Sequence, residues 1–331
     1  MAGRKKKKLW MIPVCAAVIA VAAGGILVWN TIRQDETSQT AAETGGTSSS
    51  ADVVWNGKEY NYNDHLSNFL FMGVDNREKE ATAIGQANAG QADAIYLVSW
   101  DRVEAEATVI SIPRDTMTRI QVYGPGGQDL GTVEDHISLS YAYGDGGYES
   151  CELTKDAVSD LFYGLPVQGY CSINMDGIPV LTQSVGTVTV TVPNDSLENI
   201  DPQYQEGAQV TLTPEMTETF VRYRDITVSQ SAISRMERQE EYIRAFGEAA
   251  TERFSTDPGF VTELYTALEP YMVTNIGTDQ FLDIMEGISS GNTNEGWTVP
   301  GEGSEGEMYD EYHVDDDALY QKIIETFYRE A

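Results

Sequence analysis

The chain has 331 residues, of which 41% are apolar and 10% aromatic, so it can bury a substantial core in one large domain or two small ones. Its formal net charge of -31 argues against nucleic acid or anionic lipid surfaces as partners of the body, because both would repel it. Five of the 21 basic residues precede an apolar run near the N-terminus, which leaves 16 against 52 acidic residues. Twelve of these 16 are arginines. Since the guanidinium group matches phosphate oxygens two at a time, arginines clustered in an acidic chain indicate an anion-binding site.

The N-terminus carries the pattern of a membrane anchor. Residues 1–8 are largely basic, and residues 9–29 form an uncharged, mostly apolar run. As a helix rising about 1.5 Å per residue, this run is roughly 31 Å long, enough to cross a bilayer. The lysines on its N-terminal side predict a single-pass protein of the cell membrane with a cytoplasmic N-terminus and an extracellular body. A cleaved signal peptide is the competing interpretation, although the apolar run continues past the small residues of "AVAAG" to Trp29.

Two short segments connect this run to the body. Residues 30–50 are rich in Ser, Thr, Gly and Ala without periodicity, which predicts a flexible linker. Residues 51–65 predict a hairpin, because "VVWNGKEYNY" places an Asn-Gly turn at Asn56 and Gly57.

Residues 66–255 mix strand-like and helical patterns in an order that predicts one α/β domain, with three layers (α/β/α) and a mixed central sheet. The predicted strands are 68–74, 94–100, 107–112, 169–175 and 186–192. The predicted helices are 149–162, 176–184, 213–223 and 232–250.

The C-terminal residues 256–331 predict a helical extension. Its acidic segment, Glu302 to Asp317, is expected to be a solvated loop rather than a metal site, because its acids lack the spacing of an EF-hand loop.

Two cysteines outside the apolar run, Cys151 and Cys171, lie at the start of a predicted helix and on the strand that follows it. A helix leading away for about 18 Å and a strand returning for about 16 Å can bring the two thiols together. A disulfide and a pair of buried free thiols both fit this pattern.

Polar residues stand at the ends of the predicted strands, where a side chain leaves the core and meets a cleft. Asp75 and Arg77 follow the first strand, Asp93 precedes the second, and Arg114 and Asp115 follow the third. Two carboxylates at neighbouring strand ends suit Mg²⁺, which takes one or two carboxylates together with phosphate oxygens and water. Taken one at a time, the same residues also fit ordinary turn and cap positions.

Arginines dominate the stretch "FVRYRDITVSQSAISRMERQEEYIR". On a helix, Arg235, Arg238, Gln239 and Tyr242 share one face, because they are spaced i, i+3, i+4 and i+7. Arg244 points nearly the opposite way, toward glutamates, and is predicted to form surface ion pairs. The shared face predicts a phosphate-binding cluster, joined by two arginines from the end of the preceding helix, with an Arg/Glu surface network as the alternative. Those two arginines are Arg222 and Arg224.

The segments "NFLFMGVDNR", "QADAIYLVSWD", "TVISIPRDT", "ISLSYAYGDGG", "VGTVTVTVP", "FVRYRD" and "SRMERQ" resemble, in order and spacing, those of the LytR-CpsA-Psr family. The resemblance covers about residues 66 to 250, and "IPRDT" with a later "RMERQ" is its most specific part. It implies an enzyme that transfers a glycopolymer, such as teichoic acid or capsular polysaccharide, from an undecaprenyl-diphosphate carrier to peptidoglycan. It also implies Mg²⁺ as cofactor, an apolar pocket for the lipid tail, and a membrane-anchored catalytic domain over 66–255.

The family resemblance assigns roles to individual positions. Asp75 and Asp93 match the acidic positions associated with the metal, and Arg77 follows in the same loop. Asp75, Arg77 and Arg114 are therefore the expected catalytic residues, with Asp75 as metal ligand or base. The expected diphosphate ligands are Arg114, Arg222, Arg224, Arg235, Arg238 and Gln239.

The sequence departs from the family pattern at two places: it reads "SQSAISRMERQ" where many relatives carry Asp-x-Gly, and it has Asp225 where a histidine often stands. Two other functions stay open from the sequence. One is a non-catalytic envelope regulator, and the other is a polyprenyl-diphosphate hydrolase that uses the same site.

Overall fold

The computed structural model describes residues 51–76, 83–85, 89–225, 227–228, 231–257, 259–277, 280, 294–306 and 309–331. The predicted membrane span at 9–29, its flanking segments and Arg77 lie outside the described residues. Within the described residues, no helix has the length and apolar character needed to cross a membrane.

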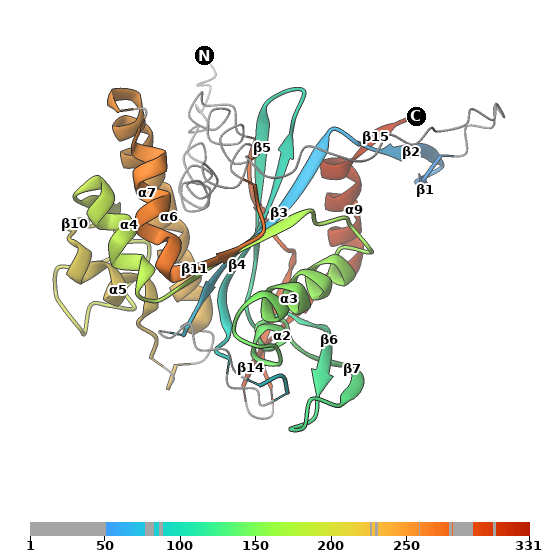
Figure 1. The fold of residues 1–331 in the computed structure, drawn as a ribbon, viewed down its shortest axis with the longest axis horizontal. Helices are drawn as coiled ribbons and strands as arrows, with labels where there is room; N and C mark the ends of the chain where they lie inside the picture. Colours follow the sequence, from blue (N-terminus) through green and yellow to red (C-terminus); the bar gives the residue numbers. More distant parts are fainter. Residues whose placement is uncertain are drawn as a thin grey trace, which may run out of the picture.

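A six-stranded mixed sheet forms the centre of the molecule, with the strand order β11-β8-β3-β4-β5-β12 (Figure 1). Strand β3 runs antiparallel to β4 and parallel to β8, and β4 runs antiparallel to β5. The first four predicted strands are confirmed as β3, β4, β5 and β8, whereas the fifth, β9, pairs with β10 outside this sheet. The bounds are β3 (Leu66–Val74), β4 (Ala92–Asp101), β5 (Glu106–Ile112), β8 (Gly169–Asn174), β9 (Val188–Thr191), β10 (Gln209–Leu212), β11 (Met272–Thr274) and β12 (Trp297–Thr298).

Both faces of the sheet are buried. Because side chains alternate along a strand, Phe69 and Phe71 of β3 join one apolar core, whereas Leu70 and Met72 join the other. Helices α4 to α7 lie on the first face and α2, α3 and α9 on the second, which confirms the predicted α/β fold class with a mixed sheet (Figure 1). The helices are α2 (Leu139–Ala142), α3 (Tyr148–Leu161), α4 (Gly177–Val185), α5 (Pro214–Arg222), α6 (Ser231–Thr256), α7 (Phe260–Leu268), the 3₁₀ turn η1 (Glu269–Tyr271) and α9 (Asp316–Phe327).

The predicted N-terminal hairpin is formed by β1 (Val53–Trp55) and β2 (Lys58–Tyr62). Its two turn residues, Asn56 and Gly57, have φ angles of 49° and 77°, the left-handed conformation that a tight hairpin turn requires. Strand β15 (Tyr328–Glu330) pairs with β2, so the last strand of the chain completes this small sheet.

The C-terminal segment corrects two expectations. Residues 256–331 are not a helical extension alone, since β11 and β12 form the two edges of the central sheet. The segment Glu302 to Asp317 is not a solvated loop. It forms most of the hairpin of β13 (Gly301–Glu305) and β14 (Asp310–Val314) and then begins α9.

A third hairpin was not predicted at all. It consists of β6 (Met117–Tyr123) and β7 (Asp129–His136), which pair antiparallel after the "IPRDT" segment. The C-terminal hairpin docks beside it, since the amide N–H of Tyr312 donates to the carbonyl of Asp115 at 2.8 Å. Contacts between segments almost 200 residues apart therefore shape the region that follows β5.

The two cysteines of the body are free and buried, so the free-thiol alternative is the one observed. The Cys151 thiol donates to the hydroxyl of Ser172 at 3.4 Å. Burial raises the pKa of Cys151 to about 12 and raises that of Cys171 as well. Both groups are therefore neutral in the folded protein at ordinary pH.

Native protein at pH 8 should react with iodoacetamide at Cys151 about 10³-fold more slowly than protein unfolded in urea, because only the thiolate is nucleophilic. Quantitative mass spectrometry of the peptide that carries Cys151 measures the two rates. Equal rates in the two states would contradict a buried, neutral thiol.

Candidate active site

Three polar strand ends meet at one end of the central sheet. Asp75 follows the last residue of β3, Asp93 is the second residue of the antiparallel β4, and Arg114 follows β5, which is antiparallel to β4. They line one cleft of about 480 Å³, so the structure brings these three predicted positions together. The other residues lining the cleft are Gln91, Asp115, His136, Ser138, Leu139, Arg222, Arg224, Arg235, Tyr309 and Asp310.

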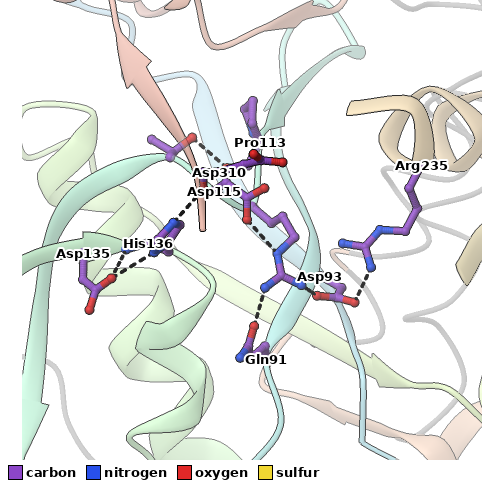
Figure 2. Close-up of polar contacts among 10 residues, drawn as sticks. Gln91, Asp93, Pro113, Asp115, Asp135, His136, Arg235 and Asp310 are labelled. Atoms are coloured by element: carbon purple, nitrogen blue, oxygen red, sulfur yellow. Dashed lines mark hydrogen bonds and ion pairs between the residues drawn. The ribbon is translucent and has the colours of Figure 1, made fainter. Parts of the chain in front are cut away.

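Asp93 joins two arginines from distant parts of the chain. One carboxylate oxygen accepts from Arg114, and the other accepts from Nη1 of Arg235 at 2.8 Å (Figure 2). The side chain of Asp93 is only 7% exposed, so its charge is compensated almost entirely by these two guanidinium groups. Asp93 therefore aligns the arginines of α6 and of the "IPRDT" segment toward the same cleft.

Arg235 has more hydrogen-bonding capacity than its surroundings use. It is 5% exposed, and within the described residues its Nε and Nη2 have no hydrogen-bond partner. Burial, and next the charge of Arg224, lower the pKa of Arg235 to about 10, so the group stays charged at neutral pH. A buried cation with unmet donors is stabilised by an anion in the cleft.

Arg114 is held in place by three neighbours. Besides Asp93, its guanidinium group donates to the side chain of Gln91 and, through Nε, to Asp115 at 3.1 Å. Burial, and also the charges of Arg235 and Arg224, lower its pKa. The guanidinium group is thus preorganised at the cleft before any ligand is present.

Arg222 and Arg224 reach the same cleft from the end of α5 and the residues after it. Arg222 is exposed and pairs with Glu218 at 3.1 Å, one helical turn earlier. Nε of Arg224 is buried and has no partner among the described residues. Four predicted arginines, at positions 114, 222, 224 and 235, therefore line one cleft.

Arg238 and Gln239 lie apart from this cleft. Arg238 is 1% exposed and donates to the carbonyls of Phe220 and Tyr223, and Gln239 donates to that of Val221 at 3.1 Å. Arg235, Arg238 and Tyr242 are thus buried on one face of α6 as predicted, but of the residues on this face only Arg235 lines the polar cleft. Arg238 and Gln239 instead bind the carbonyl end of α5, where a helix leaves acceptors unsatisfied.

The ion pairs predicted for Arg244 are confirmed, although its side chain is only 18% exposed rather than on the surface. It forms ion pairs with Glu241 at 2.7 Å and Glu248 at 2.8 Å, on the same helix.

An apolar pocket adjoins the polar cleft and shares Asp93 and Arg222 with it. Its volume is about 120 Å³, and Gln239 and Tyr242 stand on its wall. The remaining lining is almost wholly apolar and comes from β3, β4, β8 and helices α4 to α6: Phe71, Met72, Gly73, Ala94, Tyr96, Cys171, Ile173, Met175, Ile178, Leu181, Val221, Ile243 and Phe246.

The carboxylates of the cleft have the chemistry of a magnesium site with few protein ligands. Asp75, Asp93 and Asp115 all line it, although the described residues contain no cluster of three or more metal-ligating side chains. Oδ1 of Asp75 accepts from the Gln91 N–H at 2.6 Å, and its second oxygen has no partner in the described part of the chain. Each carboxylate oxygen offers two lone pairs, so a cation next to Asp93 can coexist with the arginine contacts. This donor set fits Mg²⁺ bound mainly through phosphate and water.

Several lining residues were not expected from the sequence. Gln91 and Ser138 lie within the family-like segments "QADAIYLVSWD" and "ISLSYAYGDGG" but were not assigned a role, whereas His136, Tyr309 and Asp310 belong to hairpins with no recognisable motif. Tyr309 and Asp310 come from the segment predicted to be a solvated loop. Only long-range strand pairing brings them to the site, so no local pattern could have identified them.

The fold and the cleft define an α/β protein with an arginine-lined site beside an apolar pocket. The LytR_cpsA_psr family model matches residues 28–326, and the chain belongs to this family.

Two relatives carry functional names. The chain is 28% identical over 243 residues to "Polyisoprenyl-teichoic acid--peptidoglycan teichoic acid transferase TagU" of Halalkalibacterium halodurans, and the match covers 72% of this chain and 71% of the relative. It is 25% identical over 244 residues to the TagV transferase of Bacillus subtilis, which covers 72% of this chain and 56% of the relative. Among solved structures, TagT bound to LI-WTA has a TM-score of 0.58 at 22% identity, covering 81% of this chain and 92% of TagT, which supports the fold.

Proposed function

We propose that this chain is a phosphotransferase that attaches an anionic cell-wall glycopolymer to peptidoglycan from an undecaprenyl-diphosphate-linked precursor. The observation that carries the proposal is Arg235, a buried guanidinium group with unmet donors in an arginine cleft; its ion-pair partner Asp93 also lines the adjoining apolar pocket. An amphiphilic diphosphate ester matches this cleft and pocket, with phosphate oxygens on the arginines and the polyprenyl chain in the apolar pocket. The names of the relatives support teichoic acid as the class of polymer.

The transfer step follows from this arrangement. A hydroxyl oxygen of the acceptor glycan attacks the phosphorus next to the glycopolymer, and a new P–O bond forms as the bond from that phosphorus to the bridging oxygen breaks. The electron pair leaves with polyprenyl phosphate. Arg114, Arg224 and Arg235 are placed to stabilise the negative charge that develops on the phosphate oxygens.

The hydroxyl proton needs an acceptor. Asp75 is the best candidate, because both oxygens of Asp93 are bonded to arginines whereas one oxygen of Asp75 is unengaged in the described part of the chain. When bound, Mg²⁺ supplies further positive charge to the diphosphate, and Asp75 and Asp93 would hold it. Arg77 of the same loop stays a predicted catalytic residue.

The position of this site in the cell is also part of the proposal. Residues 9–29 are proposed to anchor the chain in the membrane, with the body outside the cell, where lipid-linked precursor and peptidoglycan meet. Neither nucleic acid nor an anionic lipid surface suits so acidic a body.

The function is tested with full-length protein, undecaprenyl-diphosphate-linked teichoic acid precursor, Mg²⁺ and peptidoglycan. The expected products are undecaprenyl phosphate and peptidoglycan that carries the polymer through a phosphodiester, formed only when both substrates are present. Release of the lipid phosphate at the same rate without peptidoglycan would identify a hydrolase instead. Absence of any product, with the precursor still bound, would favour the non-catalytic regulator.

Asp75→Asn should lower the transfer rate about 10²- to 10³-fold, because the amide neither accepts the proton nor carries charge. Repeating the assay over a range of Mg²⁺ concentrations separates the two roles of Asp75. If Asp75 is the general base, Asp75→Asn stays slow at saturating Mg²⁺. If Asp75 is a metal ligand, the rate of the variant recovers as the Mg²⁺ concentration rises. A variant with unchanged rate and unchanged Mg²⁺ dependence would remove Asp75 from the site.

A further inference from the structure

The side of the cleft away from Arg235 has a different chemical character. Figure 2 shows His136 and Asp310 on the opposite side of Asp93 from Arg235. Their neighbours in the chain also line the cleft: Ser138 and Leu139 follow His136, and Tyr309 precedes Asp310. We call these five residues the distal wall. None of the five is an arginine, so the cleft offers hydroxyl, carboxylate and aromatic groups in addition to its arginines.

Ser138 has an unused hydroxyl on this wall. The residue is fully buried, and its Oγ has no hydrogen-bond partner within the described residues. Its backbone is satisfied, since its N–H donates to the carbonyl of Arg114 at 3.2 Å and its own carbonyl accepts from Ala92 N–H at 3.2 Å. The unmet hydrogen bond therefore belongs to the side chain alone. A hydroxyl can both donate and accept, which suits a ligand that is itself rich in hydroxyl groups.

Tyr309 provides an exposed aromatic surface at the same wall. It is 68% exposed, although large apolar side chains are normally covered. Its ring stands edge-on to that of His136, with centroids 6.3 Å apart and planes at 84°. The π face carries negative charge density, so it attracts the C–H groups on one face of a pyranose ring.

His136 fixes the position of this segment. Its Nδ1 lies 2.9 Å from Oδ1 of Asp135, and its Nε2 lies 2.9 Å from the carbonyl oxygen of Asp310 (Figure 2). Strand β14 is further held where the hydroxyl of Tyr312 donates to the carbonyl of Val299 at 2.8 Å. Asp310, which follows Tyr309 in the chain, is thus held by His136, and its strand is held by Tyr312. A preorganised aromatic surface loses little entropy when a ligand binds.

We propose that the distal wall is the subsite for a pyranose unit of the acceptor glycan, with Tyr309 stacking on the sugar and Ser138 hydrogen-bonding one of its hydroxyls. His136 is a positioning residue, since it holds the segment that carries Tyr309. The inference rests on the proposed function for its choice of a glycan as acceptor. The arginines bind the anionic donor, and the distal wall, none of whose five residues is an arginine, leaves the neutral hydroxyl of the acceptor facing the same phosphorus.

Acceptor kinetics of full-length protein test the subsite. Tyr309→Ala should raise KM for peptidoglycan glycan strands about tenfold and leave KM for the lipid-linked donor unchanged. Tyr309→Phe keeps the ring and should restore the acceptor KM to within about twofold of wild type. An unchanged acceptor KM in Tyr309→Ala would overturn the proposal.

A pair of serine variants separates binding from folding. Ser138→Ala removes a hydroxyl that has no partner in the described protein, so it should weaken the acceptor without lowering the melting temperature. Ser140→Ala is the matched control: Ser140 is also fully buried, but its Oγ donates to the carbonyl of Ile137 at 2.6 Å. This variant should lower the melting temperature and leave the acceptor KM unchanged. Equal acceptor KM values in the two variants would overturn the role of Ser138.

Calorimetry with a soluble N-acetylglucosamine–N-acetylmuramic acid oligosaccharide, without donor, separates this proposal from the transferase proposal. Binding that is weakened about tenfold by Tyr309→Ala supports the subsite even if no transfer is detected. Transfer that depends on Arg235 but not on Tyr309 or Ser138 would retain the transferase and eliminate the subsite. Wild-type protein that does not bind the oligosaccharide, with an acceptor KM insensitive to Tyr309, would also eliminate it.

Discussion

Replacing Arg235 with alanine should lower glycopolymer transfer about 10²- to 10³-fold, the usual effect of losing one preorganised group that stabilises charge in a transition state. The structural reason is that Arg235 is buried, charged and only partly hydrogen-bonded within the described residues. Its loss removes charge from the cleft, yet Asp93 keeps Arg114 as partner. The folded state is therefore expected to persist. Rates measured at saturating donor and acceptor, together with thermal unfolding, check both parts.

Arg235→Lys is the informative companion variant. Lysine preserves the charge but not the planar fork, so it should recover only part of the lost activity. Full activity in both variants would place the transferring phosphate away from this arginine. If Arg235→Ala fails to fold but Arg235→Lys folds, the activity of Arg235→Lys decides whether Arg235 acts on the transferring phosphate.

Replacing Arg238 with alanine should instead lower the free energy of unfolding, by about 3 kcal/mol. Arg238 is almost fully buried and donates to two carbonyls at the end of α5, which carry the negative end of the helix dipole. The family resemblance makes it a diphosphate ligand, but in the structure it lies apart from the cleft. Urea denaturation measures the loss in free energy of unfolding. The donor KM, measured at urea concentrations well below the unfolding midpoint, shows whether donor binding changes as well.

Arg253→Ala is the matched control on the same helix. Arg253 is partly exposed, pairs with Asp257 at 2.9 Å and lies over the ring of Phe260, so its removal should cost only about 1 kcal/mol. A similar loss of stability in the two variants would show that the carbonyl contacts of Arg238 contribute little. If Arg238→Ala keeps its stability but shows a large rise in donor KM, Arg238 is a diphosphate ligand after all.

The sequence predicted the centre of the fold well, because the long strands are buried and the long helices are amphipathic, and both leave clear local patterns. The prediction was weakest for the C-terminal segment, residues 256–331. Strand β12 has two residues, β13 reads GEGSE and β14 reads DEYHV, so these strands are too short or too polar to show a clear apolar period. Strand β12 forms because β5 offers an unpaired edge, and β13 and β14 pair with each other, so their formation depends on pairing in the folded chain rather than on a pattern within each segment.

The candidate site shows the same division. Strand ends indicated Asp75, Asp93 and Arg114, and helical spacing indicated Arg235. Spacing could not distinguish Arg235 from Arg238, which are one turn apart on one buried face. What separates them is the end of α5, whose carbonyls capture Arg238 and leave Arg235 for the cleft. Such a difference depends on where a neighbouring helix stops, to within one residue.

The two edges of the central sheet have a consequence for biosynthesis. Strands β11 and β12 cover opposite edges, and both lie in the last fifth of the chain. A nascent chain that has emerged only as far as Leu268 therefore presents two open, apolar edges, which are templates for pairing with other chains. Closure of the sheet is a late event that requires nearly the whole chain. We expect early-terminated products of this gene to aggregate or be degraded rather than accumulate as smaller folded domains.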